Sequence, residues 1–306
     1  MTRKALLVGI NYTGTSHALR GCINDVNNMQ TMLRSIYRFT QIETLLEKQA
    51  TTKNILSSLY NMVTTAESGD HVLFHFSGHG SQVRDDNGDE ADGLDEIICP
   101  IDLNWRDRII RDDDLKKIFD LAKEGVEITV ILDCCHSGDG IDQPNKYSPV
   151  TNTIRKIFKP KLSSRYLAPP AHLAVRSFSR SIKRPVENNS VLISGCRSYQ
   201  TSADARINGQ FCGACTYAII TTLQHNQWNM THKDLTDDIN NMLSRMGFTQ
   251  RPELSGPERR LNDKFLNGSN VVTRSIVPRS LSFVEPGSIL HRGLKLIEKL
   301  LSYFTK

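Results

Sequence analysis

The chain has 306 residues, of which 39% are hydrophobic and 23% are charged, a composition ordinary for one large or two modest globular domains. No stretch approaches the roughly 18 apolar residues of a membrane-spanning helix, and the N-terminal MTRKALLVGINY lacks a signal-peptide cleavage pattern. The seven cysteines follow no disulfide-framework spacing, so we expect a reduced, cytoplasmic setting.

The predicted elements alternate between strands and helices, which favours an α/β fold with a parallel sheet and helices on both faces. Segment 249–268 is predicted to be a loop, and 289–304 an amphipathic helix. In chain order we expect strands at 5–10, 42–46, 71–77, 96–100, 126–132 and 191–194, and helices at 22–37, 52–66, 113–121, 214–224 and 231–246.

The net charge of +5 is unevenly distributed. Residues 144–186 hold ten Lys or Arg and no acid, whereas residues 85–96 hold seven acids and no base. The basic segment is also rich in Pro and Ser and has weak periodicity, which indicates a long loop or linker.

Two predicted strands are followed by residues that can do chemistry. His79 comes just after the strand at 71–77, and Cys134 and Cys135 come just after the strand at 126–132. In parallel sheets, functional residues gather at the carboxyl ends of strands, where an imidazole can activate a thiol. His79 precedes Cys135 by 56 residues, close to the spacing of about fifty in caspases. These residues alone indicate a Cys-His hydrolase as one option, and two buried structural thiols as the other.

Five segments then carry a closer resemblance: SGHGSQ, DDNGDEADGLDEIICPID, IIRDDDL, DCCHSG and ISGCRSYQTSAD. In this order they resemble the metacaspase branch of the caspase-like cysteine peptidases, over residues 4–268 with a break at the basic linker. The resemblance implies the caspase-hemoglobinase α/β fold, with a mostly parallel central sheet. It also implies a large catalytic subunit (1–142), a linker (143–187), a small subunit (188–268) and a C-terminal tail (269–306).

The resemblance assigns roles to the strand-end residues. Cys135 aligns with the nucleophile and His79 with the base and acid, while Cys134 is expected to be structural. The backbone N–H groups of Gly80 and Cys135 would form the oxyanion hole.

Members of this branch cleave after Arg or Lys, so the resemblance implies an acidic substrate pocket. By position, Asp25 and Asp133 would form its floor, with Cys22 and Ser77 lining it. Carboxylates pair well with a guanidinium. Outside the family context, a helix-surface acid or a local turn residue is the favoured explanation of Asp25.

The resemblance also implies Ca²⁺, which prefers hard oxygen ligands. By position, the ligands would be Asp95, Asp112, Asp113 and Asp142. Asp92 is the alternative to Asp95, and Asp113 with Asp114 the alternative pair in RDDDL. A solvated acidic loop without metal remains the competing interpretation.

An Arg/Lys-specific peptidase could cut its own basic linker, and we expect autoprocessing between about Lys146 and Arg184. A solvated basic loop is the alternative. The linker has few aromatics, so specific nucleic-acid binding is not expected.

Two further motifs have ordinary explanations. Cys212 and Cys215 form a CxxC without a second pair, so core packing is favoured over zinc or redox chemistry. For the basic helix at 289–304, docking on its own domain is favoured over the alternative, contact with a membrane surface. The resemblance implies a working monomer. The rival functions are a non-proteolytic caspase-like scaffold and a CC/CxxC redox protein.

Overall fold

The computed structural model describes residues 1–85, 93–135, 162–171, 173, 189–197 and 200–266. These residues all belong to one compact unit, residues 1–272. The predicted helix at 289–304 and the site residue Asp142 lie outside the described residues.

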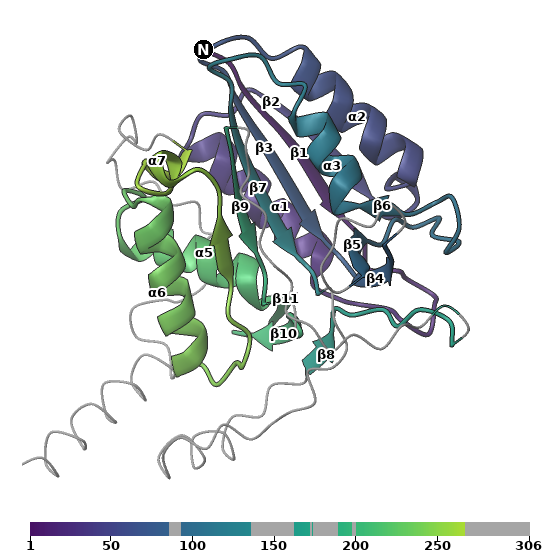
Figure 1. The fold of residues 1–306 in the computed structure, drawn as a ribbon. Helices are drawn as coiled ribbons and strands as arrows, with labels where there is room; N and C mark the ends of the chain where they lie inside the picture. The colour runs from purple at the N-terminus through teal and green to yellow at the C-terminus, as the bar shows by residue number, and fades with distance from the viewer. Residues whose placement is uncertain (86–92, 136–161, 172, 174–188, 198–199, 267–306) are drawn as a thin grey trace, which may run out of the picture. The chain divides into compact units, whose positions relative to one another are not determined.

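A six-stranded sheet forms the centre of the fold (Figure 1), with strand order β12-β9-β7-β3-β1-β2. All neighbouring strands pair in parallel except β12, which is antiparallel to β9. The predicted α/β class with a mostly parallel sheet is therefore confirmed. The strands are β1 (Arg3–Gly9), β2 (Gln41–Leu46), β3 (His71–Ser77), β7 (Glu127–Asp133), β9 (Ser190–Ser194) and β12 (Glu253–Ser255).

Helices cover both faces of this sheet (Figure 1). On one face, Leu6 and Val8 of β1 and Phe74 of β3 form a core with α2 and α3. The other face packs against α1, and α5 packs against α1 and β7. The helices are α1 (Cys22–Ser35), α2 (Thr52–Thr64), α3 (Asp112–Phe119), α5 (Ala214–His225), α6 (His232–Arg245), α7 (Glu258–Leu261) and the short η1 (Glu47–Gln49).

Helix α1 lies very close to the end of β1. A Cβ atom added at Gly9 would come within 2.7 Å of Val26 Cγ2 and 2.9 Å of the Cys22 carbonyl oxygen. Only glycine allows this approach without a shift of the helix. As a result, the first turn of α1, including Asp25, lies beside the carboxyl ends of the strands.

Two small sheets lie beside the main one. One has the order β4-β5-β6 and the other β11-β10-β8. Their strands are β4 (Gly80–Arg84), β5 (Leu94–Ile98), β6 (Ile110–Arg111), β8 (Leu162–Ser164), β10 (Ala203–Ile207) and β11 (Gln210–Gly213).

Three elements contradict the predicted loops. Strand β8 lies in the segment taken as linker, and β12 and α7 lie in 249–268. Each has only three or four residues, too few for a periodic apolar pattern. The two strands exist because neighbouring strands supply their hydrogen bonds.

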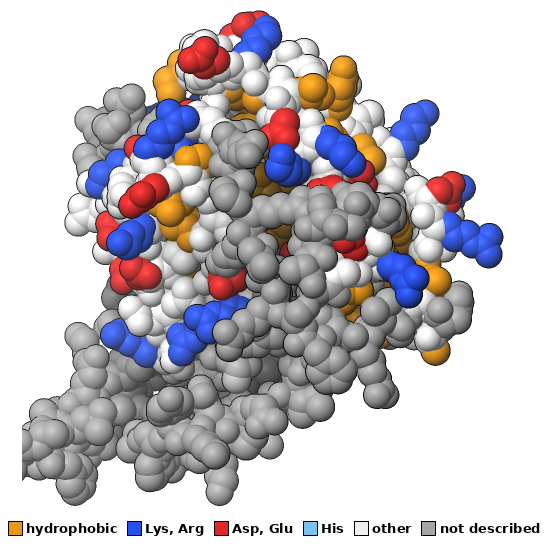
Figure 2. Space-filling view, in the orientation of Figure 1, with side chains coloured by type: hydrophobic (Ala, Val, Ile, Leu, Met, Phe, Trp, Pro, Cys, Tyr) orange, Lys and Arg blue, Asp and Glu red, His pale blue; other side chains and the backbone are white. Residues whose placement is uncertain are grey.

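The surface shown in Figure 2 carries Lys, Arg, Asp and Glu side chains interspersed among the described residues. Within the described part of the chain, no helix combines the length and apolar character needed to cross a membrane. The predicted division into two subunits and a tail stays a prediction.

Candidate active site

The site begins with the register of three parallel strands. Gly9 of β1 pairs with Ser77 of β3, and Ser77 pairs with Asp133 of β7. The three strands therefore end at one level. His79 and Cys135, each two residues past its strand, lie at this shared edge, as the sequence predicts.

The two adjacent cysteines have different surroundings. Cys134 belongs to the apolar core that includes α2 and α3, and burial raises the pKa of its thiol well above the usual value. The Cys135 thiol donates to the Ser202 carbonyl oxygen at 3.3 Å and receives the Ser202 N–H. A hydrogen bond to Cys135 is also the main cause that raises the pKa of the Cys196 thiol. Cys134 therefore has the structural position expected of it, and Cys135 faces the small sheet.

His79 is held from two sides and is only 3% exposed. Its Nε2 lies 2.7 Å from the His17 carbonyl oxygen, and its backbone N–H donates to the Tyr12 hydroxyl at 3.0 Å. Tyr12 in turn donates to the Cys99 carbonyl oxygen at 2.6 Å. Burial lowers the pKa of His79, while the carbonyl groups of His17 and Arg165 oppose that shift. A lowered pKa keeps the imidazole neutral and able to act as a base.

Among the described contacts of these two side chains, no hydrogen bond joins the Cys135 thiol to the His79 ring. Nucleophile and base are often loosely placed before the reactive complex forms. A rotation of the thiol away from Ser202 would be needed to bring it toward the substrate carbonyl.

Gly80 is one of the two predicted oxyanion donors. Its N–H donates to the Arg165 carbonyl oxygen at 2.9 Å. A Cβ atom at Gly80 would collide with the backbone of Cys135, so the two segments predicted to form the oxyanion hole are in contact. The Gly80 N–H therefore faces a peptide carbonyl, as one of the two predicted donors of an oxyanion hole would.

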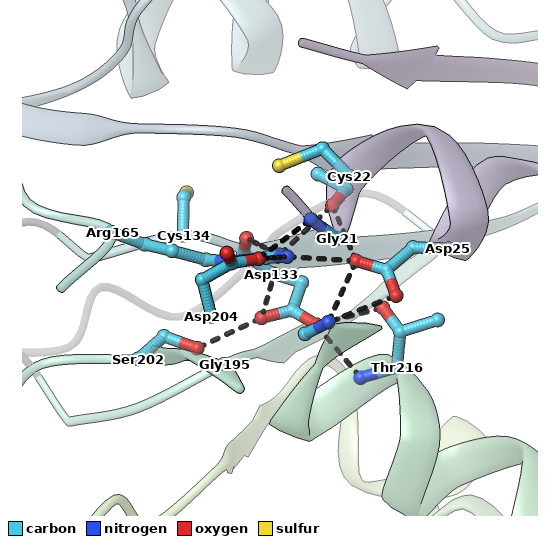
Figure 3. Close-up of polar contacts among 12 residues, drawn as sticks. Gly21, Cys22, Asp25, Asp133, Cys134, Arg165, Gly195, Ser202, Asp204 and Thr216 are labelled. Carbon is cyan, nitrogen blue, oxygen red and sulfur yellow. Dashed lines mark hydrogen bonds and ion pairs between the residues drawn. The ribbon is translucent and has the colours of Figure 1, made fainter. Parts of the chain in front are cut away.

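Next to this carbonyl, the predicted pocket residues surround the Arg165 guanidinium (Figure 3). Nη2 lies 2.9 Å from Asp25 Oδ2, and Nη1 lies 3.3 Å from Asp133 Oδ1. Nη1 also donates to the Ser77 hydroxyl at 2.8 Å and to the Asp133 carbonyl oxygen at 2.9 Å. Asp25, Ser77 and Asp133 therefore form one pocket, and Arg165 is completely buried in it.

A third carboxylate, which the sequence analysis did not assign, completes the pocket. Asp204 Oδ1 lies 3.1 Å from Arg165 Nη2, and the same carboxylate accepts the N–H groups of Arg20 and Gly21. Burial acts to lower the pKa of Arg165, but Cys22 and the three carboxylates raise it well above the ordinary value. The pocket therefore stabilises the positive charge of the guanidinium.

Cys22 is buried beside this pocket. Burial raises the pKa of its thiol to about 12, with Arg165 opposing, so the thiol lines the pocket without adding charge near neutral pH.

The pocket acids are fixed by hydrogen bonds from the protein. Asp133 accepts from the Ser202 hydroxyl at 2.8 Å and from both the N–H and the hydroxyl of Thr216 at 2.8 Å. Asp25 accepts from Ser77 at 2.7 Å and from the N–H of Gly213 at 2.9 Å. These hydrogen bonds hold the acids in position around the guanidinium.

The predicted calcium ligands are only partly described. Asp95 is buried and its Oδ2 accepts from Arg111 Nε at 2.6 Å, while Asp112 and Asp113 lie in the first turn of α3. In the described part of the chain, no group of three or more His, Cys, Asp or Glu side chains is arranged to hold a metal ion. Since Asp142 lies outside that part, the calcium site stays a prediction.

The CxxC pair is buried, with Cys212 on β11 and Cys215 on α5, and both are free thiols. This agrees with the predicted core packing.

Sequence reasoning missed Arg165 and Asp204. Asp204 could have been found, because it ends the quoted ISGCRSYQTSAD motif. Arg165 is one of ten basic residues in its segment, and nothing in the local pattern distinguishes it from the others.

A cysteine and a histidine at neighbouring strand ends, beside a buried acidic pocket, are the arrangement expected of a caspase-like cysteine peptidase. Comparisons with known proteins agree with this class of protein. The family model for the metacaspase peptidase C14 domain matches residues 3–144. Metacaspase-1A of Aspergillus oryzae is 35% identical over 288 residues, covering 83% of this chain and 67% of the relative. Metacaspase-1 of Pyricularia oryzae is 33% identical over 287 residues, covering 83% and 71%. The chain belongs to the metacaspase family.

A solved structure confirms the fold alone. The crystal structure of protein GSU0716 from Geobacter sulfurreducens superposes with a TM-score of 0.61 at 24% identity, covering 87% of this chain and 98% of that one.

The Tyr12 hydroxyl is expected to stabilise the His79 loop. Tyr12→Phe removes the acceptor of the buried His79 N–H and the donor to Cys99, so the free energy of unfolding should fall by about 1–3 kcal/mol. Urea denaturation measures it. Tyr60→Phe, on the exposed side of α2, is the matched control and should change stability by less than about 0.5 kcal/mol. Equal stability of the two variants would remove this role of the hydroxyl.

Proposed function

We propose that this chain is a calcium-dependent cysteine endopeptidase that cleaves after Arg or Lys and processes itself in its basic linker. In this proposal it works as a cytoplasmic monomer. The family supplies the cysteine peptidase activity, and the observation that carries the specificity is the pocket of Asp25, Asp133 and Asp204, which already holds an arginine side chain.

The pocket geometry favours Arg over Lys. A guanidinium presents five N–H donors in a planar fork, whereas an ammonium is a compact point charge. In the structure, Nη1 and Nη2 of Arg165 together contact three carboxylates and the Ser77 hydroxyl. A lysine would leave part of this acceptor set without a donor, at a cost in binding. We therefore expect both residues to be accepted at the P1 position, with Arg preferred.

The proposed chemistry uses the groups at the strand ends. Cys135 Sγ attacks the carbonyl carbon of the P1 residue while the Gly80 N–H stabilises the oxyanion. His79 takes up the thiol proton and gives it to the leaving amine. Water, deprotonated by His79, then hydrolyses the thioester and restores the thiol.

The proposed calcium requirement is supported by the arrangement of acids around β5 and the start of α3. Arg111, which immediately precedes α3, binds Asp95, so Asp95 and the α3 acids Asp112 and Asp113 come from neighbouring segments. These three carboxylates, joined by Asp142, would hold the ion. Calcium would supply positive charge where Arg111 now neutralises Asp95.

Hydrolysis of a fluorogenic peptide with Arg at P1 tests the proposal. The wild-type chain should cleave it with Ca²⁺, cleave the Lys peptide more slowly, and leave an Asp-P1 peptide intact. Cys135→Ala should abolish cleavage, whereas Cys134→Ala should retain most of it, because Cys135 is the proposed nucleophile and the Cys134 side chain lies in the apolar core. If the folded wild-type protein cleaves none of these peptides, a non-proteolytic scaffold becomes the better proposal.

Calcium binding should be measurable without turnover. In the Cys135→Ala background, isothermal titration calorimetry should detect Ca²⁺, and Asp95→Asn should weaken it because a hard anionic ligand is lost. Asp107→Asn, at an acid outside the proposed set, is the control. Full cleavage activity in a chelator would contradict the calcium requirement and leave the peptidase proposal intact.

Substrate affinity should depend on pH through Asp25. Burial raises the pKa of Asp25 to about 7, although Arg165 opposes this shift. That value holds with Arg165 in the pocket, and the carboxyl keeps its proton to higher pH once Arg165 has left to admit a substrate. KM for an Arg-P1 peptide should therefore rise as the pH falls through the neutral range. Losing one charged hydrogen bond costs about 1.5–3 kcal/mol, or roughly 10- to 100-fold in KM.

Asp25→Asn separates this effect from the titration of His79. The variant should have a high KM that no longer varies with pH in this range. Its kcat should still fall at acidic pH, because His79 becomes protonated. An unchanged KM profile in Asp25→Asn would exclude Asp25 as the titrating group.

A further inference from the structure

A histidine is buried in the middle of β3, on the face opposite the aromatic core. Phe74 and Phe76 of this strand belong to the core with α2 and α3. His75 lies between them, so its side chain points to the other face of the sheet. It is fully buried, and its Nε2 lies 3.2 Å from the Thr216 hydroxyl in the first turn of α5. Burying an imidazole is costly unless the ring is hydrogen-bonded, so the contact with Thr216 is what makes this position tolerable.

Thr216 connects this histidine to the acidic pocket (Figure 3). Its hydroxyl and its N–H both donate to Asp133 Oδ2, each at 2.8 Å. The N-cap residue of α5, Gly213, provides no side-chain cap, so Asp133 also accepts an N–H that the helix itself leaves unpaired. Thr216 therefore joins the buried imidazole of β3 to the carboxylate that contacts Arg165 Nη1.

The hydrogen bonds among these three side chains can run in only one direction. Thr216 has one hydroxyl proton and an ionised carboxylate can only accept, so that proton lies toward Asp133. The Thr216 oxygen must then accept from His75 Nε2, which makes His75 the neutral Nε2–H tautomer. The other tautomer would place the proton on Nδ1, which has no hydrogen-bond partner among the described residues. Burial lowers the pKa of His75 to about 4, although the Asp133 charge opposes this shift, so the ring is neutral at neutral pH.

The same strand supports the second pocket acid. Ser77 lies two residues after His75, so both side chains point to one face of β3. The Ser77 hydroxyl donates directly to Asp25 at 2.7 Å, whereas His75 lies deeper in the sheet and reaches Asp133 through Thr216. Two acids of the pocket are thus oriented by alternate residues of one central strand.

We propose that His75 and Thr216 are positioning residues for substrate binding: by donating in series to Asp133, they hold its carboxylate in the orientation that binds the guanidinium of a P1 arginine. This inference rests on the proposed Arg-directed peptidase function. Neither side chain touches the reacting atoms, so the pair acts on KM and not on kcat.

The first comparison isolates the Thr216 hydroxyl, using steady-state hydrolysis of an Arg-P1 peptide in the presence of Ca²⁺. Thr216→Val keeps the side-chain shape and should raise KM roughly 3- to 10-fold with kcat within about twofold, because the substrate loses part of one charged hydrogen bond. Thr216→Ser restores the hydroxyl and should return KM to the wild-type value. Thr222→Val, at another buried threonine of α5, is the control and should leave KM unchanged.

A double variant separates positioning from stability. Thr216→Val leaves the His75 N–H buried without an acceptor, so the urea midpoint of unfolding should fall. Adding His75→Phe removes that N–H and fills the space of the ring, so the urea midpoint should rise again. KM should nevertheless stay raised, because Asp133 still lacks the hydroxyl. If the pair were only structural, KM would recover together with the urea midpoint.

The part of His75 is tested by substitutions at His75 alone. His75→Phe should raise KM, because the Thr216 hydroxyl loses the donor that fixes its direction. His75→Gln should restore KM toward the wild-type value, because an amide N–H can reach the position of Nε2. An unchanged KM in folded His75→Phe would remove His75 from the inference.

The outcomes distinguish this inference from the proposed function. If the wild-type protein hydrolyses the peptide and Thr216→Val has the wild-type KM, or a lower kcat at the same KM, the positioning inference is wrong and the peptidase remains. Recovery of KM in the double variant also overturns it. The double variant carries the same test if Thr216→Val does not fold. Absence of hydrolysis by folded wild-type protein refutes the proposed function, and the inference with it.

Discussion

The rest of the site depends on one buried cluster of charge. Arg165 is fully buried, and so are the three carboxylates around it. They come from segments far apart in the chain: Asp25 from α1, Asp133 from the end of β7 and Asp204 from β10. A buried charge without a partner is strongly destabilising, so each acid fixes the position of its element relative to the others. The acidic pocket and the junction between the main sheet and the small sheet are therefore the same structure.

Glycines make this density of charge sterically possible. A Cβ atom at Gly213 would lie 2.5 Å from Arg165 Nη1, and one at Gly21 would lie 2.5 Å from Asp204 Oδ1. Both residues instead present backbone N–H groups to the pocket acids. The walls of the pocket are thus partly main chain, which gives fixed donors without side-chain freedom to lose.

Much of the fold could be predicted from the sequence because the central strands are continuous apolar runs. His71–Ser77 was predicted with its observed bounds, and the ends of the strands led directly to His79 and Cys135. The predicted pocket residues Asp25 and Ser77 also meet, at 2.7 Å. Strand β8 and the role of Arg165 could not be predicted, because three residues have no periodicity and their conformation comes from β10. A local sequence pattern identifies strands and helices that have their own apolar periodicity. It does not identify a short strand whose conformation depends on hydrogen bonds from a neighbouring strand.

The pairing of β8 with β10 has a consequence for any protein that this site would process. A substrate segment that binds in the way that residues 163 to 167 do must be extended. Its backbone N–H and C=O groups must also be free to pair with Ser202, Gly80 and the edge of β10. A helix has already used those groups internally, and a strand inside a sheet has used them with its neighbours. Binding at the site would therefore depend first on whether the target segment is unfolded or extended, and only then on its sequence. Arginines in loops and unstructured tails would be open to it, while the same residue in a helix would be protected until that helix unfolds.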